Sequence, residues 1–183
     1  STMAEKQVGT NMPLGTVAEG QAMVGKRSRT RFHTMDVNWP MIRIYASAME
    51  DGNPCYWDVD YARRRFGDIV SPPGMLMVWG MGLDWQPDAP VVADDPPLMN
   101  IPLPGTTIIN VVTETEFFRP IRVGERLNAQ EELVSVSDEK STRLGVGCFI
   151  RTQTSYRNQA GELVALHTND VYRYRPHDKE VTP

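Results

Sequence analysis

Apolar and polar residues follow a helical period in the first half of the chain and a strand-like period in the second half. Residues 39–49 repeat apolar side chains at helical spacing, and Asn38 and Pro40 suit the start of a helix. A second, shorter helix is predicted from Val59 to Phe66, ending at Gly67. The apolar face expected for the first helix consists of Met41, Ile44, Tyr45, Ala48 and Met49.

The most apolar stretch follows the sequence Ser71-Pro72-Pro73-Gly74. From Met75 to Trp85 it carries no charge before Asp84, and it is apolar on every face of a helix. Such a helix must be enclosed by other parts of the protein. We therefore predict a central apolar helix over about 72–85, followed by a proline-rich, ordered loop over 86–106.

The second half predicts an antiparallel sheet. Alternating side chains indicate strands that are separated by turns at 122–125 and 158–161. Strands joined by short turns, together with one wholly apolar helix, favour a sheet curled around that helix, an α+β fold rather than a βαβ repeat. The predicted strands span residues 107–119, 126–137, 143–157 and 163–174.

Length and composition limit the alternatives. The 183 residues suffice for one domain, which we expect over 21–175, with a flexible leader over 1–20 and a tail over 176–183. The net charge of −4 gives no reason to expect nucleic-acid binding, and no signal peptide or membrane span is visible. The two cysteines and three histidines are dispersed, which predicts no metal site and a reducing, cytoplasmic location.

The segment Asp51-Gly52-Asn53-Pro54-Cys55-Tyr56, with Ala62 six positions later, is the most informative motif. Taken locally, it is typical of a turn after a helix. It also resembles the signature of the MaoC-like dehydratases and (R)-specific enoyl-CoA hydratases, which reads Asp-x-Asn-Pro-apolar-His, five residues and then a small residue. Asp51, Asn53, Pro54 and Ala62 stand at matching positions.

The resemblance continues along the chain over about 25–174. Residues 66–76 resemble the family's entry to its central helix, 118–125 a strand and turn, and 161–164 the start of a late strand. The Pro-Pro-Gly variant is most similar to the N-terminal, FAS1-like dehydratase branch. The resemblance implies a hot-dog fold, in which an antiparallel sheet wraps around the central helix.

One position departs from the family pattern, because Tyr56 stands where the family has its catalytic histidine. Unperturbed tyrosine titrates near ~10, so its ionisation at pH 7 costs about 4 kcal/mol and leaves about a thousandfold less base. The negative charge of Asp51 raises this cost further. His33 or His167 can replace the missing base only if folding brings it near Asp51, and the alternation around His167 favours a structural role.

Other site residues are expected from the resemblance, each with a structural alternative. The family places an oxyanion donor at Gly74, which otherwise allows close packing after two prolines. Met75 and Trp79 can line an acyl channel or belong to the core. Arg119 and Arg122 can bind coenzyme A phosphates or remain solvated charges.

The resemblance therefore implies an enoyl-thioester hydratase or dehydratase subunit of lipid, fatty-acid or steroid side-chain metabolism. We expect it to shape the acyl channel, with low activity alone, while a partner hot-dog subunit supplies the Asp/His pair. The expected ligand is an acyl-CoA, with no separate cofactor, and the chain is expected to form a homo- or hetero-oligomer. The alternatives are a non-catalytic acyl-CoA-binding or regulatory protein and, ranked last, a thioesterase.

Overall fold

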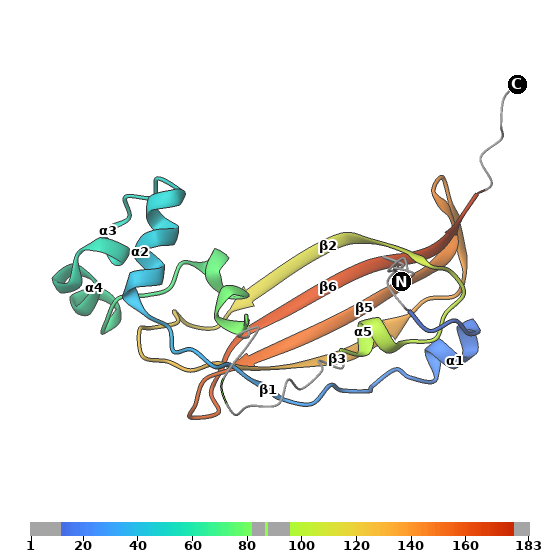
Figure 1. The fold of residues 1–183 in the computed structure, drawn as a ribbon, viewed down its shortest axis with the longest axis horizontal. Helices are drawn as coiled ribbons and strands as arrows, with labels where there is room; N and C mark the ends of the chain where they lie inside the picture. Colours follow the sequence, from blue (N-terminus) through green and yellow to red (C-terminus); the bar gives the residue numbers. More distant parts are fainter. Residues whose placement is uncertain (1–11, 82–86, 88–95, 178–183) are drawn as a thin grey trace, which may run out of the picture.

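The computed structural model describes residues 12–81, 87 and 96–177. Its core is a six-stranded antiparallel sheet in the order β1-β3-β5-β6-β2, with β4 paired to β5 at one end (Figure 1). The strands are β1 (Arg31–Phe32), β2 (Thr107–Phe117), β3 (Asn128–Val136), β4 (Lys140–Thr142), β5 (Gly145–Arg157) and β6 (Leu163–Pro176). The four long strands and the turns between them lie where the alternation predicts them, and the short strands β1 and β4 were not predicted.

Most helices of the described chain gather beyond one end of the sheet (Figure 1). These are α2 (Trp39–Ala48), α3 (Pro54–Trp57) and α4 (Val59–Phe66), whereas α1 (Val17–Gln21) and α5 (Pro97–Asn100) lie toward the other end. Helix α2 starts as predicted, with the side chain of Asn38 accepting a hydrogen bond from the Met41 N–H. Helix α4 ends at Gly67, whose φ of 88° is a conformation that glycine adopts without strain.

The face that α2 buries differs from the predicted face. Ile42 and Ala46 are fully buried, whereas Ile44 and Met49 are 70% and 62% exposed. Helix α2 has only ten residues, so the sequence pattern defines the direction of its apolar face imprecisely. The prediction included the exposed Ile44 and Met49 and omitted the two fully buried residues, whereas the predicted Met41 and Tyr45 are half-buried and pack against the core.

The continuous central helix predicted for about 72–85 is not found in the described part of that range. Residues Pro73–Met75 and Val78–Gly80 form two short 3₁₀ helices, η1 and η2, and the backbone becomes extended at Met81. Met77 and Met81 are each 63% exposed, so this segment is not enclosed on every side within one chain. Residues 82–86, the end of the predicted helix, lie outside the described residues.

From Met12 onward, the N-terminal segment has a defined structure, whereas the sequence predicts a flexible leader over 1–20. Thr16 and Glu19 form reciprocal capping bonds that start α1. The fully buried guanidinium of Arg173 donates to the Pro13 carbonyl at 2.7 Å and also holds the carbonyls of Ile101, Leu103 and Gly105. The segment is therefore attached to β6 through Pro13, with Met12 and Gly20 buried, and residues 1–11 lie outside the described part.

Two apolar clusters form the core. The first joins α2, α3, α4 and the 3₁₀ segment to one end of the sheet, and Trp79, Met75 and Ile42 are among its largest buried side chains. The second lies toward the other end, around Leu133, Ile150 and Val171. Because the clusters occupy different ends of the same sheet, the sheet surface between them is not part of either apolar core.

Candidate active site

The loop between α2 and α3 is held in shape by its own polar side chains. The Asp51 N–H donates to the Ala46 carbonyl at 2.8 Å, and Asp51 Oδ1 accepts from the Asn53 N–H at 3.0 Å. Asn53 Oδ1 in turn accepts from the Cys55 N–H at 3.1 Å, which caps α3 before Pro54. Asp51 and Asn53 are both exposed, so each fixes the turn while remaining accessible from outside.

Two tryptophans that the sequence analysis did not select fix the two ends of this loop. The indole N–H of Trp57 donates to the Asp51 carbonyl, and that of Trp39 donates to the Tyr56 carbonyl, both at 2.7 Å. The Arg43 guanidinium lies 5.3 Å from the centre of the Trp39 ring and 5.7 Å from that of Trp57. Two features of the sequence could have identified these residues. Trp57 directly follows the motif, and Trp39 begins the helix before it.

Tyr56 is buried at 6% exposure, beside the loop it belongs to. Burial raises the pKa of the Tyr56 phenol above its ordinary value, and the nearby Asp51 charge raises it further, with smaller effects from Cys55 and Tyr45. The phenol therefore stays protonated at neutral pH. It can donate a hydrogen bond, but it does not provide a general base.

Gly74 lies in η1, directly against the hydroxyl of Tyr45 from α2. A Cβ atom at position 74 would overlap this hydroxyl, so close packing by itself explains the glycine. Tyr45 is also among the groups that raise the pKa of Tyr56. The fold thus brings Asp51, Tyr56, Tyr45 and Gly74 into one region, and Tyr45 is the member that the sequence analysis missed.

Neither histidine considered as a replacement base pairs with Asp51. His33 is buried at 4% exposure beside Gly80 and Tyr156, and both its ring nitrogens lack a hydrogen-bond partner among the described residues. Burial, with a smaller effect of Arg31, lowers the pKa of His33 to about 4. The Nδ1 atom of His167 pairs with the hydroxyl of Thr115 at 2.8 Å instead.

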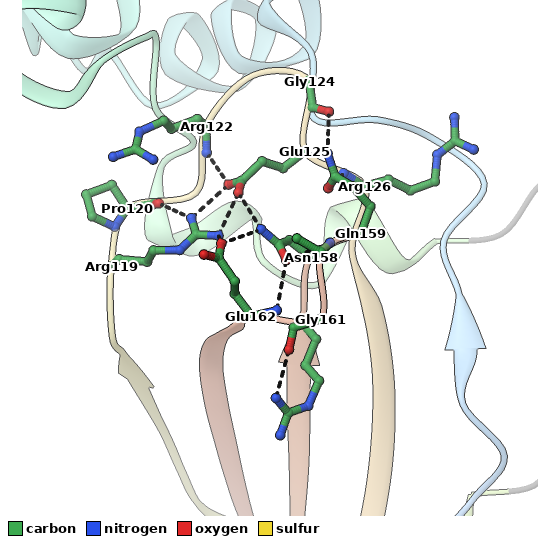
Figure 2. A network of polar contacts seen from close by, with 12 residues as sticks. Arg119, Pro120, Arg122, Gly124, Glu125, Arg126, Asn158, Gln159, Gly161 and Glu162 are labelled. Atoms are coloured by element: carbon green, nitrogen blue, oxygen red, sulfur yellow. Dashed lines mark hydrogen bonds and ion pairs between the residues drawn. The ribbon is translucent and has the colours of Figure 1, made fainter.

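Arg119 belongs to a structural network rather than to a free cationic surface (Figure 2). Its guanidinium makes two bonds to Glu125, at 2.7 and 3.1 Å, and one to Glu162 at 3.0 Å. Asn158 Nδ2 donates to the same two carboxylates, at 3.1 and 2.8 Å. Burial raises the pKa of Glu125, but these bonds and the Arg122 N–H outweigh it and lower the pKa overall. Arg119 is thus engaged in an internal ion pair, and its contact with coenzyme A phosphates stays a prediction.

The other three residues predicted to contact the substrate, Arg122, Met75 and Trp79, make contacts within the chain. Arg122 Nε donates to the Phe66 carbonyl, which ties the end of α4 to the turn at 122–125. Met75 and Trp79 are buried at 1% and 0% exposure, and the Trp79 indole N–H donates to Ser71 Oγ at 2.8 Å. Burial and this bond agree with the structural alternative, and the predicted acyl-channel role of Met75 and Trp79 stays a prediction.

A cavity of about 170 Å³ lies on the sheet surface instead. Its lining includes Met77, Tyr156 and His167 together with polar side chains of β3, β5 and β6. Within the described ranges, no group of three or more potential ligands could hold a metal ion. No helix in this part of the chain is long and apolar enough to cross a membrane.

The curled antiparallel sheet has the hot-dog architecture of known hydratases. It superposes on the MaoC-like dehydratase from Rhodospirillum rubrum with a TM-score of 0.57 over 84% of this chain and 94% of the other, at 24% identity. The family described as "FAS1-like, dehydratase domain region" matches residues 22–167. The chain belongs to this family, which confirms the predicted resemblance and α+β fold.

Several relatives carry functional names. A probable enoyl-CoA hydratase alpha subunit from Thermomonospora curvata is 36% identical over 88% of this chain and 53% of its own length. The 3-oxo-4,17-pregnadiene-20-carboxyl-CoA hydratase alpha subunit from Mycobacterium tuberculosis is 36% identical over 73% of this chain and 43% of its own length. The chain thus spans about half the length of these relatives.

A solved complex is also similar. A chain of the ChsH1-ChsH2 complex from Mycobacterium tuberculosis has a TM-score of 0.70 and 29% identity, covering 90% of this chain and 92% of that one.

Proposed function

We propose that this chain is the hot-dog subunit of an enoyl-CoA hydratase that shapes the acyl site while a partner subunit supplies the Asp/His base. In this reaction the base takes a proton from water, the oxygen of that water adds to the carbon–carbon double bond beside the thioester, and the neighbouring carbon is protonated. The observation that carries the proposal is the buried, protonated phenol of Tyr56 at the position of the catalytic histidine.

A hetero-oligomer is supported by the relatives and by the sheet. Two relatives are named as alpha subunits, and one similar structure is a complex of two different proteins. Within the described chain, β2 is an edge strand of eleven residues, and Val111 and Val112 on it are 47% and 51% exposed. A long edge of this kind can accept a strand of another chain. We therefore assign β2 as the surface that pairs with the partner.

A bulky acyl group is the proposed substrate. One relative is named for a steroid carboxyl-CoA thioester. Residues 72–81 form only short 3₁₀ turns, and Met77 of this segment lines the cavity of about 170 Å³ on the sheet. A polycyclic enoyl-CoA therefore fits the proposal better than a short straight chain.

The test compares the isolated chain with the chain purified together with an Asp/His-bearing hot-dog partner. We expect the isolated chain to be at least a thousandfold slower than the complex, which should hydrate a polycyclic 2-enoyl-CoA at about 10 s⁻¹. Hydration near that rate by the isolated chain contradicts the proposal. Acyl-CoA binding without turnover in any complex supports a binding or regulatory protein instead.

A further inference from the structure

Helix α2 carries a second, largely apolar face that points away from the core. Its core face is formed by Ile42 and Ala46, which are fully buried. The opposite stripe repeats at helical spacing, and a surface helix normally places charged and polar residues on such a stripe. Here a single charged residue stands among apolar and small side chains. The members of this stripe are Pro40, Arg43, Ile44, Ser47 and Ala48.

This stripe lines a groove of about 640 Å³, which we call the α2 groove, and Trp39 and Trp57 complete its lining. The α2 groove shares no lining residue with the cavity on the sheet. Helices α2 and α3, which carry it, stand beyond one end of the sheet (Figure 1). Small-molecule sites typically have volumes of about 300 to 1,000 Å³. The groove is therefore large enough for a small ligand, at a place separate from the sheet surface.

The two indole rings of the groove are fixed by the backbone of the motif loop. The N–H of Trp39 donates to the Tyr56 carbonyl and that of Trp57 to the Asp51 carbonyl, both at 2.7 Å. Because indole has only this one polar hydrogen, each ring offers a ligand its π face and no hydrogen-bond donor. Trp57 is 38% exposed, whereas Trp39 is half-buried against the first apolar cluster. The groove therefore suits a planar, aromatic ligand.

Arg43 gives the groove a positive charge that the described residues do not neutralise. Its guanidinium lies 5.3 Å from the centre of the Trp39 ring and 5.7 Å from that of Trp57, and within the described ranges it makes no ion pair or hydrogen bond. None of the described lining residues is acidic. The Asp51 carboxylate, on the loop that Trp57 contacts, is not part of the lining and accepts from the Asn53 N–H. An exposed guanidinium without a carboxylate suits a phosphate group.

We infer that the α2 groove binds a purine nucleotide, with the base stacked on the aromatic and guanidinium planes and a phosphate paired with Arg43. Nucleic-acid bases stack on aromatic rings and on arginine planes. The hydroxyl of Ser47, at the edge of the same stripe, can exchange a hydrogen bond with a ribose hydroxyl. This chemistry has two sources, the nucleotide end of an acyl-CoA or a free purine nucleotide. Only the first source rests on the proposed function.

The test measures binding to the purified chain by calorimetry with ADP, adenosine and ribose 5-phosphate. Adenosine lacks the phosphates and ribose 5-phosphate lacks the base, so each should bind at least about tenfold more weakly than ADP. Arg43→Gln should weaken ADP about tenfold or more and leave adenosine unchanged. Trp57→Leu should weaken both ADP and adenosine about fivefold or more. Thermal unfolding of each variant confirms that it is folded.

Arg63→Gln is the matched control, because Arg63 of α4 is also exposed and also has no ion pair among the described residues. It removes the same charge outside the groove and should leave ADP binding unchanged. ADP that binds equally well to Arg43→Gln and to the unmodified chain overturns the inference. An equal loss in Arg43→Gln and Arg63→Gln does so too, because it shows a general effect of charge.

A competition experiment distinguishes the two sources. If the groove holds the nucleotide end of the substrate, ADP displaces hexanoyl-CoA from the chain, and Arg43→Gln weakens both ligands. If the groove holds a free nucleotide, ADP and hexanoyl-CoA bind at the same time, and Arg43→Gln weakens ADP alone. Both results support the groove, and neither depends on turnover. The inference can therefore hold where hydratase activity is absent, and it can fail where the complex is active.

Discussion

The indole N–H of Trp57 donates a 2.7 Å hydrogen bond to the carbonyl oxygen of Asp51. This bond closes the loop that carries the degenerate motif, and it joins the residue after Tyr56 to the first residue of the motif. The bond therefore fixes the shape of the loop around Tyr56, which stands at the position of the family's histidine. If the chain forms one wall of a shared active site, it needs a loop of fixed shape but no base of its own.

Replacing Trp57 with Phe should weaken this loop. The change removes one hydrogen bond but keeps an aromatic ring near Arg43. We expect a loss of about 1 kcal/mol in the free energy of unfolding, measured by urea denaturation. Ile44→Val is the control, because Ile44 is 70% exposed and should change stability by less than about 0.5 kcal/mol. Equal stability of Trp57→Phe and Ile44→Val would show that the bond does not hold the loop.

Gly74→Ala should destabilise the protein by about 1–3 kcal/mol, because the added methyl group overlaps the Tyr45 hydroxyl. Adding Tyr45→Phe should recover part of this loss, since it removes the overlapping oxygen. The control is Gly52→Ala, at a position where a Cβ meets no atom within 4 Å. Unfolding curves of the four proteins test the contact, and a double variant no more stable than Gly74→Ala would contradict it.

Removing Arg119 from its network should lower the free energy of unfolding by more than the loss of an exposed ion pair does. Arg119→Met leaves Glu125, whose side chain is only 13% exposed, without its main cation, and we expect a loss of about 2 kcal/mol. Arg126→Met breaks the pair with Asp36, whose side chains are 55% and 49% exposed, and should cost less than about 1 kcal/mol. Thermal unfolding of both variants gives the comparison, and equal losses would argue against a structural role for Arg119.

The buried His33 should make the protein less stable at acid pH. Its pKa falls from 6.5 to about 4 on folding, so the unfolded chain binds the proton first as the pH decreases. Stability contributed by the neutral ring is complete above pH 6.5 and decreases toward pH 4, by at most about 3 kcal/mol. His33→Phe should flatten the pH dependence of unfolding in this window. An unchanged slope in this variant would contradict the assignment.

Strands β3, β5 and β6 were predictable because one face of each contributes buried residues to the core, which produces an alternating sequence pattern. The helices α2 and α4 were predictable from their caps, Asn38 and Gly67. The segment after Pro73 was not, because apolar composition alone does not distinguish a helix from short buried turns. Gly74 and Gly80 both weaken an α-helix there by about 1 kcal/mol each, and their neighbours Tyr45 and His33 use the space that a side chain would occupy.

The candidate site was predictable only in part. The motif located Asp51, Asn53 and Tyr56, but contacts across the fold decide the roles of Arg119 and Tyr45, and no local pattern encodes such contacts. The polar positions on the sheet had a signal in the sequence, because alternate positions of 143–157 change from Cys148 and Ile150 to Thr152 and Thr154. Only the pairing of β5 with β6 shows that Thr154 lies beside His167.

The central claim is that the phenol of Tyr56 contributes no base to the reaction. The most direct measurement is kcat of the reconstituted complex carrying Tyr56→Phe, which keeps the ring and removes only the hydroxyl. The account predicts a kcat within about threefold of the unmodified complex at pH 7, and a loss of at least about a thousandfold when the partner's histidine is replaced instead. A thousandfold loss in the folded Tyr56→Phe complex would contradict the account.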